Sequence, residues 1–183
     1  MENNVIYRKA NKNDLDDIAI LVTNLLGTCN INGVNTKTKT LEEIIENNKE
    51  EIKKDIKNYY VCECDNKIVG ICGISNIRND NIYKLDIDQY REILYLVVDK
   101  EYQKNGIGTN LMHLCCDNNK EKIIYEAWGD KKYVNSKFLL KKLNFTLLKD
   151  LGNTYYKDNG YCPYCINRDK NCNECRAEVW IKY

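Results

Sequence analysis

The most informative part of the sequence is EILYLVVDKEYQKNGIGTNLM, residues 92–112. Its first seven residues, EILYLVV, form an apolar run that predicts a buried strand. A loop with Gly106 and Gly108 follows, and apolar residues then recur at helical spacing: Ile107, Leu111, Leu114 and Cys115. Such a helix start favours binding of an anion, typically a phosphate. Its first N–H groups are unpaired, its end of the helix dipole is positive, and the glycines let the anion approach the backbone closely.

The two glycines alone are weak evidence, because a tight strand-to-helix turn would use the same residues. The loop is not a Walker loop, since no G-K-[ST] follows, and it lacks the G-x-G-x-x-G spacing of a Rossmann fingerprint. Lys104 can add positive charge at the rim of the loop.

On both sides of this stretch, residue patterns predict an α/β (α+β) domain with a mixed sheet. Asn13 is expected to cap a first helix, and Thr40 with Glu43 forms a T-x-x-E capping box for a second. Another helix is expected over 134–143. Strands are expected at 5–10, 59–64, 67–77, 92–98, 122–128, 145–151 and 176–183. The strand–helix–strand unit at 92–128 predicts parallel pairing of its two strands.

Composition excludes several classes of protein. The chain has 183 residues, and its 28 Lys and Arg nearly balance its 27 Asp and Glu, so we expect no broad nucleic-acid footprint. No apolar run is long enough to span a bilayer, and the first residues lack a signal-peptide core. We expect a cytoplasmic protein with reduced thiols and no membrane partner. His113 is the only histidine and is expected to be exposed, so catalysis by histidine or a histidine-rich metal site is not expected.

The stretch VVDKEYQKNGIGTNLM resembles the acetyl-CoA signature of the GNAT N-acetyltransferase family, whose core is [R/Q]-x-x-G-x-[G/A]. The element order resembles the GNAT fold over about residues 3–157 and 176–183. The resemblance implies transfer of an acetyl group from acetyl-CoA to an amine. It also implies that the main chain of Val98 and the side chain of Asn135 contact the pantetheine arm. The loop that would hold the pyrophosphate comprises Gln103, Lys104, Asn105, Gly106, Ile107, Gly108 and Thr109.

A catalytic base is implied by Glu92, which lies eleven residues before Gln103. This placement resembles the histone-acetyltransferase branch of the family, where a glutamate on this strand is the general base. An amine must lose a proton to attack a thioester, and a carboxylate can accept it directly or through a water. The alternative is a salt-bridged or solvated glutamate at a strand end. Glu126, on the next strand, is the second candidate base.

The sequence also departs from the family. Many members carry a tyrosine in the last helix that protonates the CoA thiolate, and Leu140 stands at that position. Asn144 replaces the usual glycine before Phe145, a mild change because asparagine tolerates a left-handed backbone. The identity of the acceptor amine does not follow from the sequence. Dimers are common in the family, so a homodimer is an open expectation.

Four of the ten cysteines follow the pattern C-x2-C-x6-C-x2-C: Cys162, Cys165, Cys172 and Cys175. Two such knuckles can bind one metal through four thiolates, and we expect structural zinc. Iron has the same ligands, and a glutaredoxin-type redox pair or disulfides are further alternatives. The segment is predicted as an insertion, 159–177, between the last two strands of a single domain over 1–183. Most of the other cysteines are expected to be buried: Cys62, Cys64, Cys72, Cys115 and Cys116.

Two functions of different classes therefore remain. The first is an active N-acetyltransferase that transfers the acetyl group directly to a primary amine, with acetyl-CoA as co-substrate. The second is a GNAT-like module that senses CoA and whose zinc knuckle docks a protein or a nucleic acid. Glu92 and the intact glycine loop favour the enzyme, whereas Leu140 in place of the tyrosine favours the module.

Overall fold

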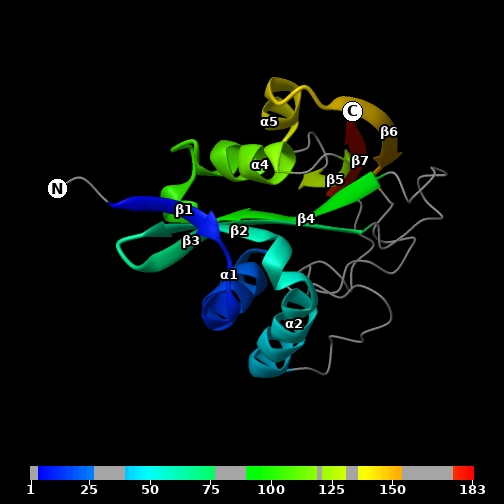
Figure 1. Cartoon of the computed structure of the whole chain (residues 1–183). Helices are drawn as coiled ribbons and strands as arrows, with labels where there is room; N and C mark the ends of the chain where they lie inside the picture. The colour runs from blue at the N-terminus through cyan, green and yellow to red at the C-terminus, as the bar shows by residue number, and fades with distance from the viewer. Residues whose placement is uncertain (1–3, 27–39, 77–89, 119–120, 131–135, 154–174) are drawn as a thin grey trace. The chain divides into compact units, whose positions relative to one another are not determined.

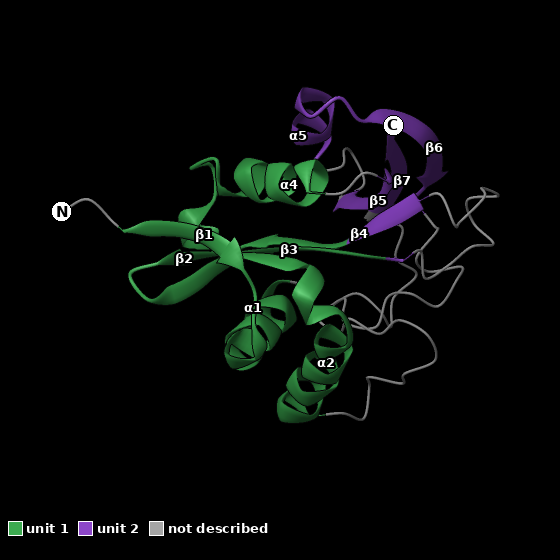
Figure 2. Ribbon diagram, in the orientation of Figure 1, with its two compact units in different colours: residues 1–30, 38–75, 94–120 green, residues 31–37, 76–93, 121–183 purple. Residues whose placement is uncertain are grey.

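A computed structural model of the chain describes residues 4–26, 40–76, 90–118, 121–130, 136–153 and 175–183. The described strands hydrogen-bond in the order β1-β2-β3-β4-β5-β7-β6, which makes a seven-stranded mixed sheet. The chain divides into two compact units, with residues 1–30, 38–75 and 94–120 in unit 1 and the others in unit 2 (Figure 2). The single domain over 1–183 with its insertion at 159–177 stays a prediction.

Unit 1 is a three-layer arrangement. Its strands are β1 (Val5–Lys9), β2 (Tyr59–Cys64), β3 (Lys67–Asn76) and the end of β4 (Tyr90–Val98). Helices α1 (Leu15–Leu26) and α2 (Leu41–Asp55) lie on one face of these strands, and α4 (Ile107–Asp117) lies on the other (Figure 1). Between α1, α2 and the strands is an apolar cluster that includes Ile18, Val22, Ile52, Tyr59, Val61, Ile71, Tyr95 and Val97.

The starts of the first two helices differ in how well the sequence predicts them. The capping box of α2 is confirmed, because Thr40 Oγ1 accepts from Glu43 N at 3.2 Å and Glu43 Oε2 accepts from Thr40 N at 2.7 Å. The prediction of Asn13 as the first cap is wrong. Asn11 Oδ1 accepts from Asn13 N, so Asn11 caps a short 3-10 helix, η1 (Lys12–Asp14), that precedes α1.

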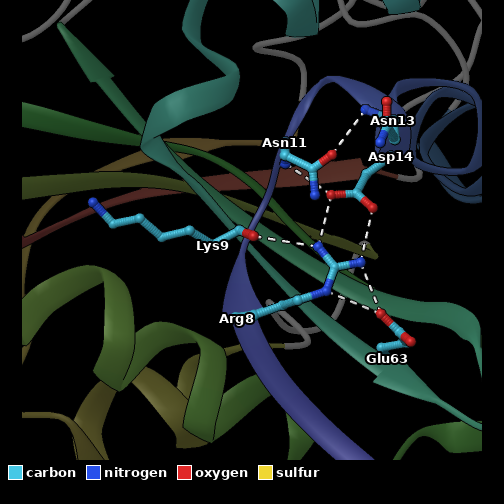
Figure 3. Close-up of polar contacts among 6 residues, drawn as sticks. All are labelled: Arg8, Lys9, Asn11, Asn13, Asp14 and Glu63. Atoms are coloured by element: carbon cyan, nitrogen blue, oxygen red, sulfur yellow. Dashed lines mark hydrogen bonds and ion pairs between the residues drawn. The ribbon is translucent and has the colours of Figure 1, made fainter.

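Arg8 on β1 ties the start of the first helical segment to the sheet (Figure 3). Its guanidinium forms a two-hydrogen-bond pair with Asp14, both bonds at 2.8 Å, and also bonds Glu63 Oε2 on β2 at 2.7 and 2.9 Å. Asp14 is buried and additionally accepts from Asn11 N at 2.7 Å. Burial of this carboxylate is tolerated because the charge-assisted bonds from Arg8 satisfy both of its oxygens.

The hairpin predicted at 59–77 is present. Strands β2 and β3 pair antiparallel, and the two turn residues, Asp65 and Asn66, have φ of 50° and 65°. Both values lie in the left-handed region that a two-residue hairpin turn requires, which explains the choice of Asp and Asn. A short 3-10 helix, η3 (Ile56–Asn58), leads from α2 into this hairpin.

Unit 2 consists of the beginning of β4 with β5 (Lys122–Asp130), α5 (Lys137–Lys142), β6 (Thr146–Gly152) and β7 (Cys175–Lys182). Strand β4 pairs with β5 in parallel, from Tyr90↔Lys122 to Ile93↔Tyr125, which confirms the predicted parallel unit. Strand β7 lies between β5 and β6 and is antiparallel to both. Asn144, between α5 and β6, has φ of 63°, as expected for the residue that replaces glycine.

The predictions for the cysteines have different outcomes. The five that were expected to be buried are buried: Cys62, Cys64, Cys72, Cys115 and Cys116. Cys162, Cys165 and Cys172 lie outside the described residues, and only the backbone of Cys175 is described. Among the side chains that the structure describes, no group of three or more His, Cys, Asp or Glu could hold a metal.

No helix in the described part of the chain combines the length and the apolar character needed to cross a membrane.

Candidate functional site

The loop between β4 and α4 presents the backbone N–H groups of a helix start. Gly106 is the N-cap of α4, and the first backbone hydrogen bond of the helix runs from Asn110 N to Gly106 O at 3.0 Å. The N–H groups of Ile107, Gly108 and Thr109 therefore precede the helical ladder. The N-cap is a glycine and has no side chain to cap them. These groups and the positive end of an 11-residue helix are suited to bind an anion.

The backbone of this loop explains one of its two glycines directly. Gly106 has φ of 80°, a left-handed conformation that costs any residue with a Cβ free energy. An added Cβ at Gly108 would lie 3.7 Å from Val98 Cγ2, an ordinary van der Waals contact. The backbone therefore favours glycine at 106 and tolerates a methyl group at 108. Lys104 is also left-handed, with φ of 66°, a feature that the sequence did not predict.

Two side chains of the loop form hydrogen bonds to backbone carbonyls, one of them at the end of β4. Gln103 Nε2 donates to the carbonyl oxygen of Val98 at 2.9 Å. Asn105 Nδ2 makes a longer bond, 3.4 Å, to the carbonyl oxygen of Tyr102. Lys104 and Asn105 are exposed, whereas the side chain of Ile107 is buried under the helix. The loop thus has an apolar anchor at Ile107 and a polar outer surface.

A second set of contacts joins the loop to the β2–β3 hairpin. Lys67 Nζ lies 2.9 Å from Asp99 Oδ2, and Asp99 N donates to Val69 O at 2.8 Å. Asp99 is also the N-cap of η5 (Lys100–Tyr102), the short 3-10 helix that opens the loop. The Lys67 ammonium holds the pKa of the Asp99 carboxyl below its usual value, so Asp99 is an anion at neutral pH.

The first turn of α4 is held against the sheet of unit 1 by two further features. Asn110 Nδ2 donates to the hydroxyl oxygen of Tyr7 on β1 at 3.0 Å. Gly70 on β3 leaves room for the helix, since a Cβ there would come within 2.9 Å of Ile107 Cγ2 and 3.0 Å of Leu111 Cδ1. A close helix–strand approach of this kind is a recognised reason for glycine inside a strand.

The two predicted carboxylates lie in unit 2 on neighbouring strands. Glu92 on β4 is opposite Ile124 on β5, and Glu126 lies two residues further along β5. Because side chains alternate along a strand, both glutamates are on the sheet face that carries the apolar cluster of Tyr90, Ile124, Val179 and Ile181. Both glutamate side chains are half-buried. The structure thus places the two candidate bases on one face.

The opposite face of unit 2 carries α5 and a buried carboxylate. Glu178 on β7 is 1% exposed and accepts from Trp180 Nε1 at 3.0 Å, Arg176 Nε at 3.3 Å and Lys137 Nζ at 3.4 Å. Leu140, which the sequence resemblance predicts to stand where many family members carry a tyrosine, is fully buried in the core. Its side chain therefore serves packing.

Sequence reasoning identified the loop but missed four residues that position it. Gly70 had a signal, because it is a glycine inside a predicted strand. Tyr7, Lys67 and Asp99 carried no sequence signal. Tyr7 contacts Asn110 and Lys67 contacts Asp99, and in both pairs the two residues lie far apart in the chain. Asn135, predicted to contact the pantetheine arm, lies outside the described residues.

Comparison with known proteins gives the family. The profile of the Acetyltransferase (GNAT) domain matches residues 55–163, more than half of the chain. No curated protein sequence matches the chain significantly.

Among solved structures, an N-acetyltransferase from Staphylococcus aureus Mu50 is similar, with a TM-score of 0.64, 18% identity and 98% of each chain covered. A putative acetyltransferase from Salmonella typhimurium, solved with its cofactor acetyl-CoA, has a TM-score of 0.65 at 16% identity, and the match covers 98% of this chain and 93% of that one. Ard1 from Thermoplasma volcanium has a TM-score of 0.59 at 16% identity, with 98% of each chain covered. The profile match and the shared fold agree with the glycine loop and the element order: the chain belongs to the GNAT family and is an acetyltransferase.

Proposed function

We propose that the protein is an acetyl-CoA-dependent N-acetyltransferase that transfers the acetyl group directly to a primary amine. The observation that carries this proposal is the start of α4, where the N–H groups of Ile107, Gly108 and Thr109 precede the helical ladder in a family that uses acetyl-CoA. The pyrophosphate binds to the backbone from Gln103 to Thr109, and Lys104 adds positive charge at the rim. A similar acetyltransferase from Salmonella typhimurium was solved with acetyl-CoA, which supports this co-substrate.

The pantetheine arm of acetyl-CoA extends from this loop along the end of β4. In our proposal the main chain of Val98 bonds the arm as an added strand would, and Asn135 contacts it from the segment after β5. Gln103 already donates to the Val98 carbonyl, and a carbonyl oxygen has a second lone pair with which it can accept from an amide of the arm.

The amine needs a base, and we propose Glu92 for this role. A half-buried carboxylate on β4, on the face that carries the apolar side chains of Tyr90 and Ile124, is suited to accept a proton from an incoming ammonium group. Attack of the neutral amine on the thioester carbonyl forms the carbon–nitrogen bond, and breaking the carbon–sulfur bond releases CoA thiolate. The second proton that the nitrogen loses as it becomes an amide passes through solvent to the thiolate. Glu126 on the same face is the alternative base.

A second function is favoured by one observation, the burial of Leu140 where the family has its thiolate-protonating tyrosine. A chain without this acid could bind CoA as a sensor and transfer acetyl groups slowly or not at all. In this alternative the four-cysteine segment docks a protein or a nucleic acid.

The experiment that separates the two functions has two steps. Calorimetric titration of the full-length protein with acetyl-CoA measures binding, and a thiol assay then follows release of free CoA with a panel of primary amines. Binding with amine-dependent CoA release supports the enzyme. Binding without turnover on any amine supports the sensor, and absence of binding rejects both.

We further propose that Cys162, Cys165, Cys172 and Cys175 bind one structural zinc ion. The support is their spacing, C-x2-C-x6-C-x2-C, which supplies four thiolates to a tetrahedral metal. The segment between them has few apolar residues, so metal binding would contribute the free energy that orders it.

A further inference from the structure

The hairpin that joins β2 to β3 contacts the co-substrate loop through the side chain of Lys67. We propose that Lys67 is a positioning residue for acetyl-CoA, which acts through Asp99 to set the geometry of the loop that receives the pyrophosphate. This inference rests on the proposed function, and it concerns residues that lie outside the six-residue signature.

Asp99 is held by three contacts that leave it little freedom. One carboxylate oxygen, Oδ2, lies 2.9 Å from Lys67 Nζ, and the other, Oδ1, accepts from Glu101 N at 3.2 Å. Its backbone N–H donates to Val69 O at 2.8 Å. Asp99 follows Val98 directly, so these contacts determine the direction in which the chain leaves β4.

The same lysine also reaches the next turn of the loop. Its ammonium lies 5.6 Å from the centre of the Tyr102 ring, within the range of a cation–π contact. Tyr102 N donates to Asp99 O at 2.9 Å, and Gln103 N donates to Lys100 O at 3.4 Å. Lys67 therefore contacts both ends of η5, the element that delivers Gln103 to the start of the signature.

The exposure of the pair indicates that stability is not its main contribution. The side chain of Lys67 is 58% exposed and that of Asp99 is 22% exposed. Exposed ion pairs contribute little to the free energy of unfolding. A pair in this position can still orient the loop, because a small displacement of several N–H groups is enough to weaken their bonds to a phosphate.

A double-mutant cycle tests the proposal on the full-length protein. The dissociation constant of acetyl-CoA is measured by calorimetry for wild type, Lys67→Met, Asp99→Asn and the double variant. The amide that Asp99→Asn introduces keeps an oxygen to accept from Glu101 N, so this change removes the ion pair and retains the cap. We expect each single variant to weaken binding by about five-fold and the double variant by no more than either single one.

Two further variants control for charge and for folding. Lys67→Arg keeps the charge and the ring contact, and it should bind acetyl-CoA within about two-fold of wild type. Lys53→Met removes the same charge from a lysine of similar exposure, 55% against 58% for Lys67, in the Lys53–Glu50 pair on α2, and should leave binding unchanged. The thermal midpoints of all variants should agree within about 3 °C, because each loses at most one surface ion pair and, where Lys67→Met is present, the contact with the Tyr102 ring.

The outcomes are distinct. If wild type does not bind acetyl-CoA, the proposed function fails and the inference fails with it. If wild type binds and Lys67→Met binds equally well, the proposed function stands and the positioning role is rejected. If the effects of Lys67→Met and Asp99→Asn simply multiply, Lys67 acts on the phosphates directly by its charge, and the role through Asp99 is rejected as well.

Discussion

The side-chain amide of Gln103 donates to the backbone carbonyl of Val98 at 2.9 Å, and this bond closes the loop between β4 and α4. The two residues are five positions apart, and the 3-10 helix η5 lies between them. The side chain of Gln103 thus stabilises the loop, in addition to the proposed contact of its backbone with the pyrophosphate. It is a donor to the end of the strand, which explains why glutamine or arginine, both of which carry N–H donors, can fill this position.

Gln103→Glu should weaken acetyl-CoA binding by about ten-fold. A carboxylate cannot donate to the Val98 carbonyl, and its charge repels both this oxygen and the incoming phosphates, a loss of about 1.4 kcal/mol. Gln103→Arg keeps a donor and should bind within about three-fold of wild type. Calorimetric titration of both variants measures the difference. Equal affinities of Gln103→Glu and wild type would contradict the role of this bond.

Gly106→Ala should destabilise the loop, and Gly108→Ala should not. An alanine at 106 must adopt φ near 80° at a cost of about 1–2 kcal/mol, or shift the N–H groups of α4. Gly108 lies inside α4, where a Cβ would make an ordinary contact with Val98, so alanine costs little there. Urea denaturation measures stability, and calorimetry measures acetyl-CoA affinity. We expect Gly106→Ala to lose stability and acetyl-CoA affinity, and Gly108→Ala to lose neither. Equal stability and equal affinity of the two variants would be inconsistent with this geometry.

Glu92→Gln should lower kcat by about 100-fold and leave the dissociation constant of acetyl-CoA unchanged. Glutamine is similar in shape but accepts no proton, so the rate with an ammonium substrate should recover as pH rises and more free amine is present. Glu126→Gln is the matched variant on the same face of unit 2. Steady-state rates across a pH series distinguish the two glutamates. If only Glu126→Gln loses activity, the base is Glu126.

Arg8→Met should lower the free energy of unfolding by about 2 kcal/mol at neutral pH, because it removes charged hydrogen bonds from Asp14 and Glu63. The Arg8 guanidinium holds the pKa of the Asp14 carboxyl below its usual value. A carboxyl with a depressed folded-state pKa adds stability above its unfolded pKa, and this stability is lost as pH falls through the folded value.

The wild type should therefore lose more stability between about pH 6 and about pH 3 than Arg8→Met does. Urea denaturation at the two pH values measures this difference, with Lys53→Met as a control for loss of one positive charge. An identical dependence on pH in wild type and Arg8→Met would show that the pair is not formed in the folded protein.

Metal analysis should find about one zinc per chain, and Cys165→Ser should lose it. Retained fold with lost activity in this variant would indicate that the segment contributes to the acceptor site. Loss of stability before activity would indicate a structural role. A preparation without metal that keeps full stability and activity would refute the zinc site.

Residue patterns alone predict the glycine loop, the buried strand before it, the parallel strand–helix–strand unit and the family signature. The parallel pairing of β4 with β5 follows from the strand–helix–strand order. The other features depend on contacts between near neighbours in the chain, as do the Thr40–Glu43 capping box and the left-handed turn at Asp65 and Asn66. Local sterics and hydrophobic period decide them, so a pattern of residues is sufficient. The cap at Asn11, two positions before the expected one, shows that element ends depend on finer competition between side chains.

The distant residues that contact the loop and the first turn of α4 are known only from the folded structure. Lys67 meets Asp99 across 32 positions in the chain, Tyr7 meets Asn110 across 103, and Gly70 lies under α4. The pairing register placed Glu92 and Glu126 on one sheet face. A shift of one residue would have turned either glutamate to the other face, and register depends on the packing of the whole sheet. Apart from the glycine inside a strand at Gly70, these contacts leave no local signature, because the neighbouring sequence does not encode a partner that only folding brings close.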